Sequence, residues 1–258
     1  SLSSGGRNLI SGNGITGIVL FNASNTSILG NLIGTDIAGT ADLGNGQIGI
    51  RINGGTATTI GGTVAGAANV IAFNGPTTVN PAMSGVVVES GTGNRILGNS
   101  IFENSNLGID LLPQNISGND LNDADTGPNN LQNFPEFSSA SLNGGNLDLA
   151  YAVPSAIVNS SYPLRIEFFK ADKDGQEGQT FLGSDVYASA QAGNSTTFTL
   201  AVSAGVPLAV GDKIVATSTD ANGNTSEFSE AVTIAAAPVV LHTPVVTGTT
   251  TYASTQST

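Results

Sequence analysis

The sequence predicts an all-β protein, in which a short parallel β-helix is followed by a β-sandwich and an extended, strand-like tail. Three observations predict this fold class: the composition, an internal repeat in the first half, and alternating apolar and polar residues in the second half. Glycine is abundant, with 34 of 258 residues, and 39% of residues are hydrophobic. This hydrophobic content argues against disorder, and β-branched residues with glycine turns favour sheets.

The charge and the missing residue types exclude several classes of protein. The formal charge is −12, so the surface should repel nucleic acid, whose phosphates need clustered cations. The chain has no cysteine, which excludes disulfides, thiolate catalysis and Cys-based zinc sites. It has no apolar run long enough to predict a membrane span. It begins at Ser1, as expected of either a processed export substrate or a cloned fragment.

The first half contains a repeat of short segments that begin with asparagine. These segments start at Asn8, Asn31, Asn69 and Asn99. A basic repeat of about 23 residues with two longer loops explains their unequal spacing, and such a repeat is typical of a coiled solenoid. We predict that the four asparagines stack as a side-chain amide ladder at one corner of the coils. The alternative is that they are turn formers, which leaves the predicted fold unchanged.

A second apolar run in each repeat shows the two-residue period of a β-strand. One set of side chains is predicted to point inward and stack in columns: Ile18/Leu20, Ile50/Ile52, Val86/Val88 and Ile109/Leu111. The residues between them are predicted to point outward: Val19, Arg51, Val87 and Asp110. This agreement between four repeats predicts a parallel β-helix of about four coils.

The repeat fades after Leu112, so residues 1–137 are assigned to the β-helix and an Asn/Asp-rich closing segment. Residues 138–236 show about seven alternating segments separated by turn signals, which is typical of an immunoglobulin-like sandwich. Within it, Leu164, Ile166 and Phe168 should face the core, with Arg165, Glu167 and Phe169 outside. Residues 237–258 form the Thr/Val-rich tail.

Three groups of residues also carry a family resemblance, which covers residues 7–235. Residues 33–36 (Ile-Gly-Thr-Asp) and 43–46 (Leu-Gly-Asn-Gly) resemble the right-handed parallel β-helix repeats of bacterial cell-surface proteins. Residues 119–137 resemble the segment that closes such repeats, and residues 166–169, 178–183 and 216–229 resemble the immunoglobulin-like module that follows them. The resemblance implies secretion to the bacterial cell surface and a structural or adhesive role. It implies no particular activity.

The sequence predicts no catalytic residues, and we expect a protein that is not an enzyme. Hydrolysis of polysaccharides on a β-helix would need two or three carboxylates that converge on one face. Acidic residues are sparse in the repeats, and Arg51 and Asp110 lie two coils apart, about 10 Å, which is too far for an ion pair. A polysaccharide-degrading enzyme is retained as an alternative.

Three acidic loops are candidate calcium sites, because carboxylates and amide carbonyls are the ligands that calcium prefers. The candidate ligands in the first two loops are Asp120, Asn122, Asp123, Asp125, Asp172, Asp174 and Glu177. The third loop runs from Asp220 to Glu227. The alternative is turn chemistry, in which Asp and Asn side chains bond nearby backbone amides. No cofactor is required, and a bound calcium ion would be structural.

The two ends of the chain predict assembly with other copies. The tail has no charged side chain and would offer an exposed β-branched strand, with candidate contact residues Val239, Val240, Val245, Val246, Thr249, Thr251 and Tyr252. The first coil begins without a covering helix, although solenoids need a cap. We therefore predict a subunit of an extracellular fibre, in which the tail of one copy donates a strand to the uncapped end of the next. The alternative is an adhesin or stalk module of a larger surface protein, which binds a glycan or host surface and contacts neighbouring domains.

Overall fold

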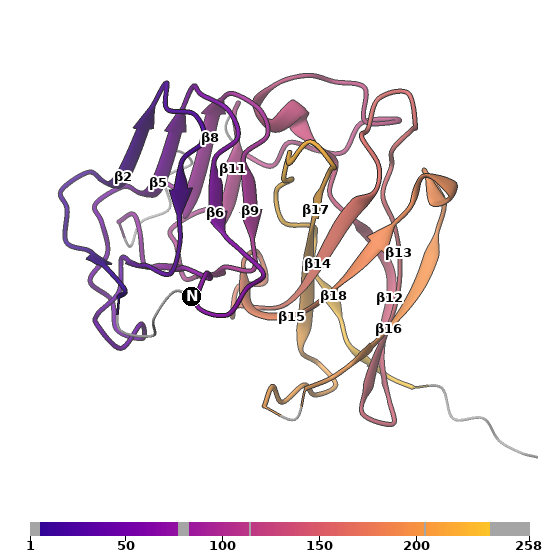
Figure 1. The fold of residues 1–258 in the computed structure, drawn as a ribbon. Helices are drawn as coiled ribbons and strands as arrows, with labels where there is room; N and C mark the ends of the chain where they lie inside the picture. The colour runs from indigo at the N-terminus through magenta and orange to yellow at the C-terminus, as the bar shows by residue number, and fades with distance from the viewer. Residues whose placement is uncertain (1–5, 77–82, 114, 204, 238–258) are drawn as a thin grey trace, which may run out of the picture.

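The computed structural model describes residues 6–76, 83–113, 115–203 and 205–237 (Figure 1). Apart from Ala237, the tail lies outside these residues, and so do all seven candidate contact residues in it. Within the described residues the chain is all-β, with two short 3-10 helices at Pro128–Leu131 and Ser189–Gln191.

Three stacked parallel sheets build the first part of the chain, as the repeat predicts. The first sheet contains β1 (Leu9–Ile10), β4 (Leu32–Ile33), β7 (Val70–Ala72) and β10 (Ser100–Phe102). The second contains β2 (Thr16–Phe21), β5 (Ile48–Asn53), β8 (Val86–Ser90) and β11 (Ile109–Leu111). The third contains β3 (Ser27–Ile28), β6 (Thr59–Gly61) and β9 (Arg95–Leu97). Successive coils contribute neighbouring strands to each sheet, which is the arrangement of a β-helix; we call this part the solenoid.

The register of the second sheet confirms the predicted columns. Ile50 pairs with Ile18 in the preceding coil and with Val86 in the following one. Inward side chains fill one continuous core, and both Ile50 and Ile52 are fully buried. The glycine that opens each run is required by close packing, since a Cβ on Gly49 would lie 2.5 Å from the carbonyl oxygen of Gly85.

Two four-stranded sheets that face each other build the second part, which we call the sandwich. One sheet contains β16 (Thr196–Ala201), β13 (Asn146–Ala152), β12 (Glu136–Asn143) and β19 (Ala235–Ala236), in that order. The other contains β15 (Gly178–Tyr187), β14 (Leu164–Ala171), β17 (Lys213–Thr219) and β18 (Val232–Thr233). Aromatic rings fill the space between them, with Phe168 at 5.5 Å from Tyr151 and 5.6 Å from Phe198.

The sandwich covers the last coil of the solenoid, and this corrects one prediction. Leu164, Ile166 and Phe168 face the sandwich core, as expected. However, Glu167 and Phe169 are not outside: their exposed fractions are 0% and 3%. The sheet of β14, β15 and β17 lies between the solenoid and the other sheet, so its outer face is an interface (Figure 1).

The contact between the two parts is a shared apolar core. Four side chains of the sandwich belong to the same hydrophobic cluster as the interior of the solenoid: Phe169, Ala171, Val215 and Phe228. Burial of such side chains is the main source of stability in folded proteins, so the solenoid and the sandwich should unfold as one cooperative unit.

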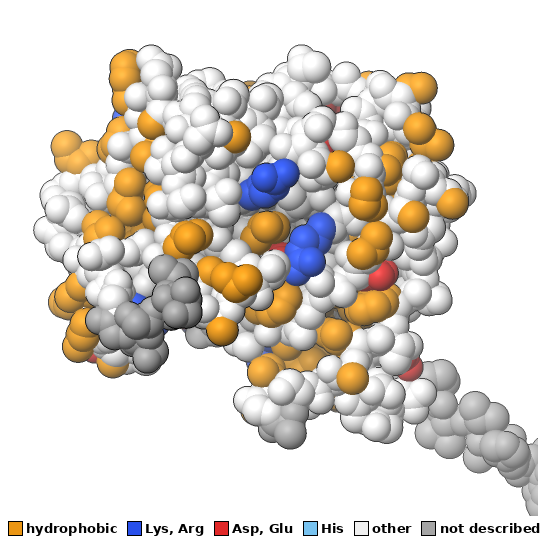
Figure 2. Space-filling model, in the orientation of Figure 1, with side chains coloured by type: hydrophobic (Ala, Val, Ile, Leu, Met, Phe, Trp, Pro, Cys, Tyr) orange, Lys and Arg blue, Asp and Glu red, His pale blue; other side chains and the backbone are white. Residues whose placement is uncertain are grey.

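The first coil has no such cover within the described part of the chain. Its inward residues Ile10, Ile18 and Leu20 are only partly buried. Its outer surface carries exposed apolar side chains, with Val19 52% and Phe21 71% exposed. Hydrophobic side chains also gather at this end in Figure 2, at the left. No helix in the described segments has the length and apolar character required to cross a membrane.

Candidate functional site: the capped end of the solenoid

The four predicted asparagines form a ladder along one corner of the solenoid. Asn8 Nδ2 donates to Asn31 Oδ1 at 2.8 Å, Asn31 Nδ2 donates to Asn69 Oδ1 at 3.1 Å, and Asn69 Nδ2 donates to Asn99 Oδ1 at 2.9 Å. The backbone N–H of Asn31 also donates to Asn69 Oδ1, at 2.8 Å. Along the ladder, each amide group therefore donates to the amide oxygen of the following coil and accepts from the preceding coil, while Asn69 Nδ2 also donates to the Ile28 carbonyl.

A second ladder, which the sequence analysis missed, runs along another corner. Asn13 Nδ2 donates to Asn45 Oδ1 at 2.7 Å, Asn45 Nδ2 to Asn74 Oδ1 at 2.8 Å, and Asn74 Nδ2 to Asn104 Oδ1 at 2.9 Å. The signal was present, because the first three of these asparagines each precede a glycine. Asn-Gly is also a common turn sequence, and nothing in the sequence alone separates the two roles.

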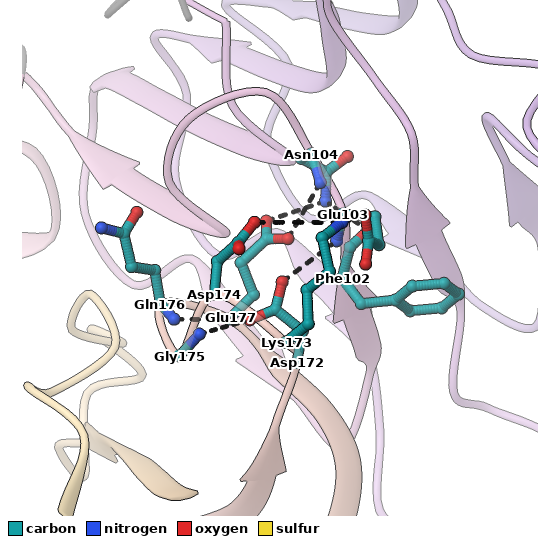
Figure 3. Close-up of polar contacts among 9 residues, drawn as sticks. All are labelled: Phe102, Glu103, Asn104, Asp172, Lys173, Asp174, Gly175, Gln176 and Glu177. Carbon is teal, nitrogen blue, oxygen red and sulfur yellow. Dashed lines mark hydrogen bonds and ion pairs between the residues drawn. The ribbon is translucent and has the colours of Figure 1, made fainter. Parts of the chain in front are cut away.

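A glutamate from the sandwich ends the second ladder. Asn104 Nδ2 donates to Glu177 Oε1 and the backbone N–H of Asn104 donates to Glu177 Oε2, both at 2.9 Å (Figure 3). The carboxylate therefore takes the place that the amide oxygen of the next asparagine would occupy. Glu177 is 1% exposed, so these hydrogen bonds satisfy a buried group.

Other sandwich and closing-segment side chains cap further backbone N–H groups at this end of the solenoid. Glu167 Oε2 accepts from Gly98 N at 2.7 Å, and Glu227 Oε1 accepts from Leu111 N at 2.8 Å. Two more caps are a hydroxyl and an amide oxygen: Thr225 Oγ1 accepts from Ile96 N, and Asn129 Oδ1 from Asn94 N, both at 3.0 Å. These N–H groups have no following coil, and a buried N–H without an acceptor costs about 1–3 kcal/mol.

Other residues of the loop that carries Glu177 also contact the solenoid. Asp172 Oδ1 accepts from Gly175 N at 2.9 Å, and Asp172 Oδ2 accepts from the backbone N–H of Glu103 at 3.3 Å. Lys173 forms an ion pair with Glu103, while the side chain of Asp174 is 67% exposed (Figure 3). Of the three candidate calcium ligands in this loop, two therefore hold the junction and one points to solvent.

In the first acidic loop, Asp123 has many hydrogen-bond partners. Its carboxylate accepts from Asn133 N at 2.8 Å, Gln132 Nε2 at 3.0 Å and Ser160 Oγ at 2.6 Å. Asp120 accepts from the backbone N–H of Ala124, and Asn122 has a positive φ of 68°. In the third loop, Asp220 accepts from Asn224 N at 2.8 Å.

Within the described residues, no group of three or more acidic or histidine side chains is placed to hold a metal ion. Asp125 Oδ1 is a buried oxygen without a hydrogen-bond partner, and burial raises the pKa of this carboxyl. Calcium binding by these loops stays a prediction.

Burial raises the pKa of the capping carboxyls. The pKa of Glu177 lies well above its usual 4.5, and that of Glu227 is raised to about 7, because desolvation penalises the charged form. Burial also raises the pKa of Glu167, although the Gly98 N–H and the adjacent Arg165 favour its charge. All three carboxyls are buried at the contact between the solenoid and the sandwich, with exposed fractions of 2% or less.

Comparisons with known proteins give one structural match. No protein-family model matches the chain. No curated protein matches it either. The crystal structure of the adhesin domain of Epf from Streptococcus pyogenes aligns with a TM-score of 0.31 and 13% sequence identity. The alignment covers 43% of this chain and 35% of that chain, so this chain spans about a third of that structure. At this TM-score the match assigns neither fold nor activity.

Proposed function

We propose that this chain is a non-catalytic structural module of a secreted bacterial surface protein. In this proposal an immunoglobulin-like sandwich closes one end of a right-handed β-helix. The observation that carries the proposal is the junction, where Phe169 and Phe228 complete the solenoid core and Glu177 ends an asparagine ladder. Such a junction suits a rigid rod that transmits force or sets distance, rather than a hinge around a reaction site.

The order of the sandwich strands supports the immunoglobulin-like assignment. The chain crosses between the two sheets, so β12 and β13 lie with β16, while β14 and β15 lie with β17. Sheets built in this way from about 100 residues are typical of the immunoglobulin class.

The burial and full hydrogen bonding of Glu177 and Glu227 support a non-catalytic role for these two junction carboxyls. A general acid or base must reach the proton it transfers. Both carboxylate oxygens of Glu177 and of Glu227 are occupied by N–H groups of the chain.

The uncovered first coil supports assembly through that end. In both ladders each asparagine donates to the amide oxygen of the following coil, and Asn8 and Asn13 stand first. Asn8 Oδ1 and Asn13 Oδ1 therefore accept no hydrogen bond from any described residue and are available to N–H or O–H donors of a partner molecule. Two first coils facing each other would present acceptors to acceptors. A partner that supplies N–H or O–H donors fits better, and we propose the Thr-rich tail of a second copy, which would give a head-to-tail fibre. The role of the tail rests on its sequence alone.

Static light scattering on the full chain tests the fibre. Two changes should abolish growth of the particles: deletion of residues 238–258, and Phe21→Glu, which puts a charge on the first coil. The matched control is Val186→Glu, because Val186 is 60% exposed on β15 of the sandwich, and this variant should assemble like the parent.

A parent chain that stays monomeric at high concentration, or a deletion variant that assembles as well as the parent, would refute the fibre. The chain would then be better described as a stalk or adhesin module joined to neighbouring domains. The non-catalytic proposal has a separate test, because release of reducing ends or unsaturated products from acidic polysaccharides would contradict it.

A further inference from the structure

The outer face of the second sheet carries a small polar pocket that the proposed function does not use. The backbone register places Val87 next to Arg51 in the preceding coil and next to Asp110 in the following one. The pocket has a volume of about 200 Å³ and is lined by these three residues together with Glu89 and Gln47. Two coils separate Arg51 from Asp110, which the sequence predicts to be too far for an ion pair, but both residues line the same pocket.

Asp110 is the unusual group in this pocket. Its side chain is 0% exposed, and its Oδ2 accepts a hydrogen bond from Ser84 Oγ at 3.2 Å. Its Oδ1 is buried without any hydrogen-bond partner. Burial raises the pKa of this carboxyl to about 6, so it is largely ionised at neutral pH. Buried carboxylate oxygens are usually satisfied in folded proteins, so an unpartnered oxygen on a residue that lines a pocket points to a donor such as a water molecule or a ligand hydroxyl.

The two charged residues beside Asp110 in the pocket, Arg51 and Glu89, form an ion pair with each other. Arg51 Nε and Nη2 both lie 2.6 Å from Glu89 Oε1, and Asn53 Nδ2 donates to Glu89 Oε2. Both Glu89 oxygens therefore already accept hydrogen bonds from the chain, while the side chain of Arg51 is 38% exposed and keeps N–H groups free. The pocket thus combines one unsatisfied acceptor, one partly free donor and the amide of Gln47.

This set of groups selects among ligand classes. A metal ion is disfavoured by the Arg51 guanidinium, which pairs with Glu89, and no group of three or more acidic or histidine side chains is placed to hold a metal among the described residues. An anion is disfavoured by Asp110. A neutral ring with adjacent hydroxyls can donate to Asp110 and accept from Arg51, and its C–H face can lie on the aliphatic side chains of Val87, Ile48 and Leu112. The volume is below the roughly 300–1,000 Å³ typical of sites for drug-sized ligands, which suits a single sugar ring.

We propose that this pocket binds one neutral hexopyranose unit of a glycan, with Asp110 Oδ1 as the acceptor for its hydroxyl groups. No aromatic ring lines the pocket among the described residues, so the affinity for a single sugar should be low, with a dissociation constant on the order of 1 mM. Many copies on one surface would raise the overall binding strength. The site goes beyond the structural role and does not depend on fibre assembly.

Saturation-transfer difference NMR on the full chain tests the site, with the methyl glycosides of glucose, galactose and mannose as probes. Asp110→Asn keeps the shape of the side chain and removes the charge, and Val87→Phe fills the pocket without removing a polar group. Each should weaken binding at least about tenfold. Asp148→Asn, an acid-to-amide change on β13 of the sandwich, is the matched control and should bind like the parent.

Thermal melts of each variant separate loss of the site from loss of the fold, which is needed because Asp110 and Val87 are 0% and 3% exposed. Binding of at least one glycoside, lost in both pocket variants and kept in the control, supports the site. Three results would overturn it: no glycoside binds at tens of millimolar, Asp110→Asn binds as well as the parent, or only an amine such as methylammonium binds.

Discussion

The asparagine ladder makes its strongest prediction at Asn69, in the middle of the solenoid. Asn69→Ala removes the acceptor of the buried Asn31 N–H and the donor to the Ile28 carbonyl, which are bonded at 2.8 Å each. At about 1–3 kcal/mol for an orphaned buried group, plus the small cavity, the free energy of unfolding should fall by about 3 kcal/mol. The midpoint of thermal unfolding should fall by about 10 °C in a chain of this size.

The matched control is Asn8→Ala at the open end of the same ladder. Asn8 is exposed and donates one ladder hydrogen bond, to Asn31 Oδ1, where water can replace it. Its loss should cost about 1 kcal/mol or less. Urea unfolding followed by circular dichroism measures both variants. Equal effects at Asn69 and Asn8 would show that these residues act as turn formers, and the reasoning from the ladder would be refuted.

Three further predictions concern the junction, the acidic loop and the packing of the coils. The pKa of Glu227 is about 7 in the folded state against 4.5 ordinarily, so the folded state holds a proton that the unfolded chain releases. The free energy of unfolding should therefore fall by up to about 3 kcal/mol as pH rises from 4.5 to 7.5, and Glu227→Gln should flatten this slope in urea titrations. If the first acidic loop binds calcium, millimolar calcium should raise the melting temperature above that in EDTA, and Asp125→Asn should remove the difference; identical melts of the parent in calcium and EDTA would contradict the prediction. Gly49→Ala should destabilise the fold by several kcal/mol, because its Cβ would lie 2.5 Å from Gly85 O, whereas Gly14→Ala, with no atom within 4 Å, should be tolerated in the same melts.

The interior of the solenoid could be predicted from the sequence because its signal is local. Alternation within one strand places Ile50 and Ile52 on the same face, and repetition in the next coil shows that this face is buried. The same logic places Ile166 and Phe168 in the sandwich core.

The junction could not be predicted, because its contacts join residues far apart in the chain. Glu167 and Phe169 have the alternation of an outward face, and only the position of the last coil makes that face an interface. Glu177 was assigned to a calcium loop for its spacing, but its partner Asn104 lies 73 residues earlier. The pocket at Asp110 could not be predicted either, because its lining residues come from different coils. The ion-pair partner of Arg51 is Glu89, one coil away, and not Asp110.

The one-way ladders have a consequence for how the length of such a protein can change. Each ladder asparagine donates to the next coil in the same way as the asparagine before it. An internal coil can therefore be duplicated or lost without changing the hydrogen bonds between the last asparagine of the second ladder, Asn104, and Glu177. Every such event lengthens or shortens the molecule by about 4.8 Å and leaves the sandwich attachment untouched. The length of the solenoid can thus vary while the residues that cap its last coil stay the same.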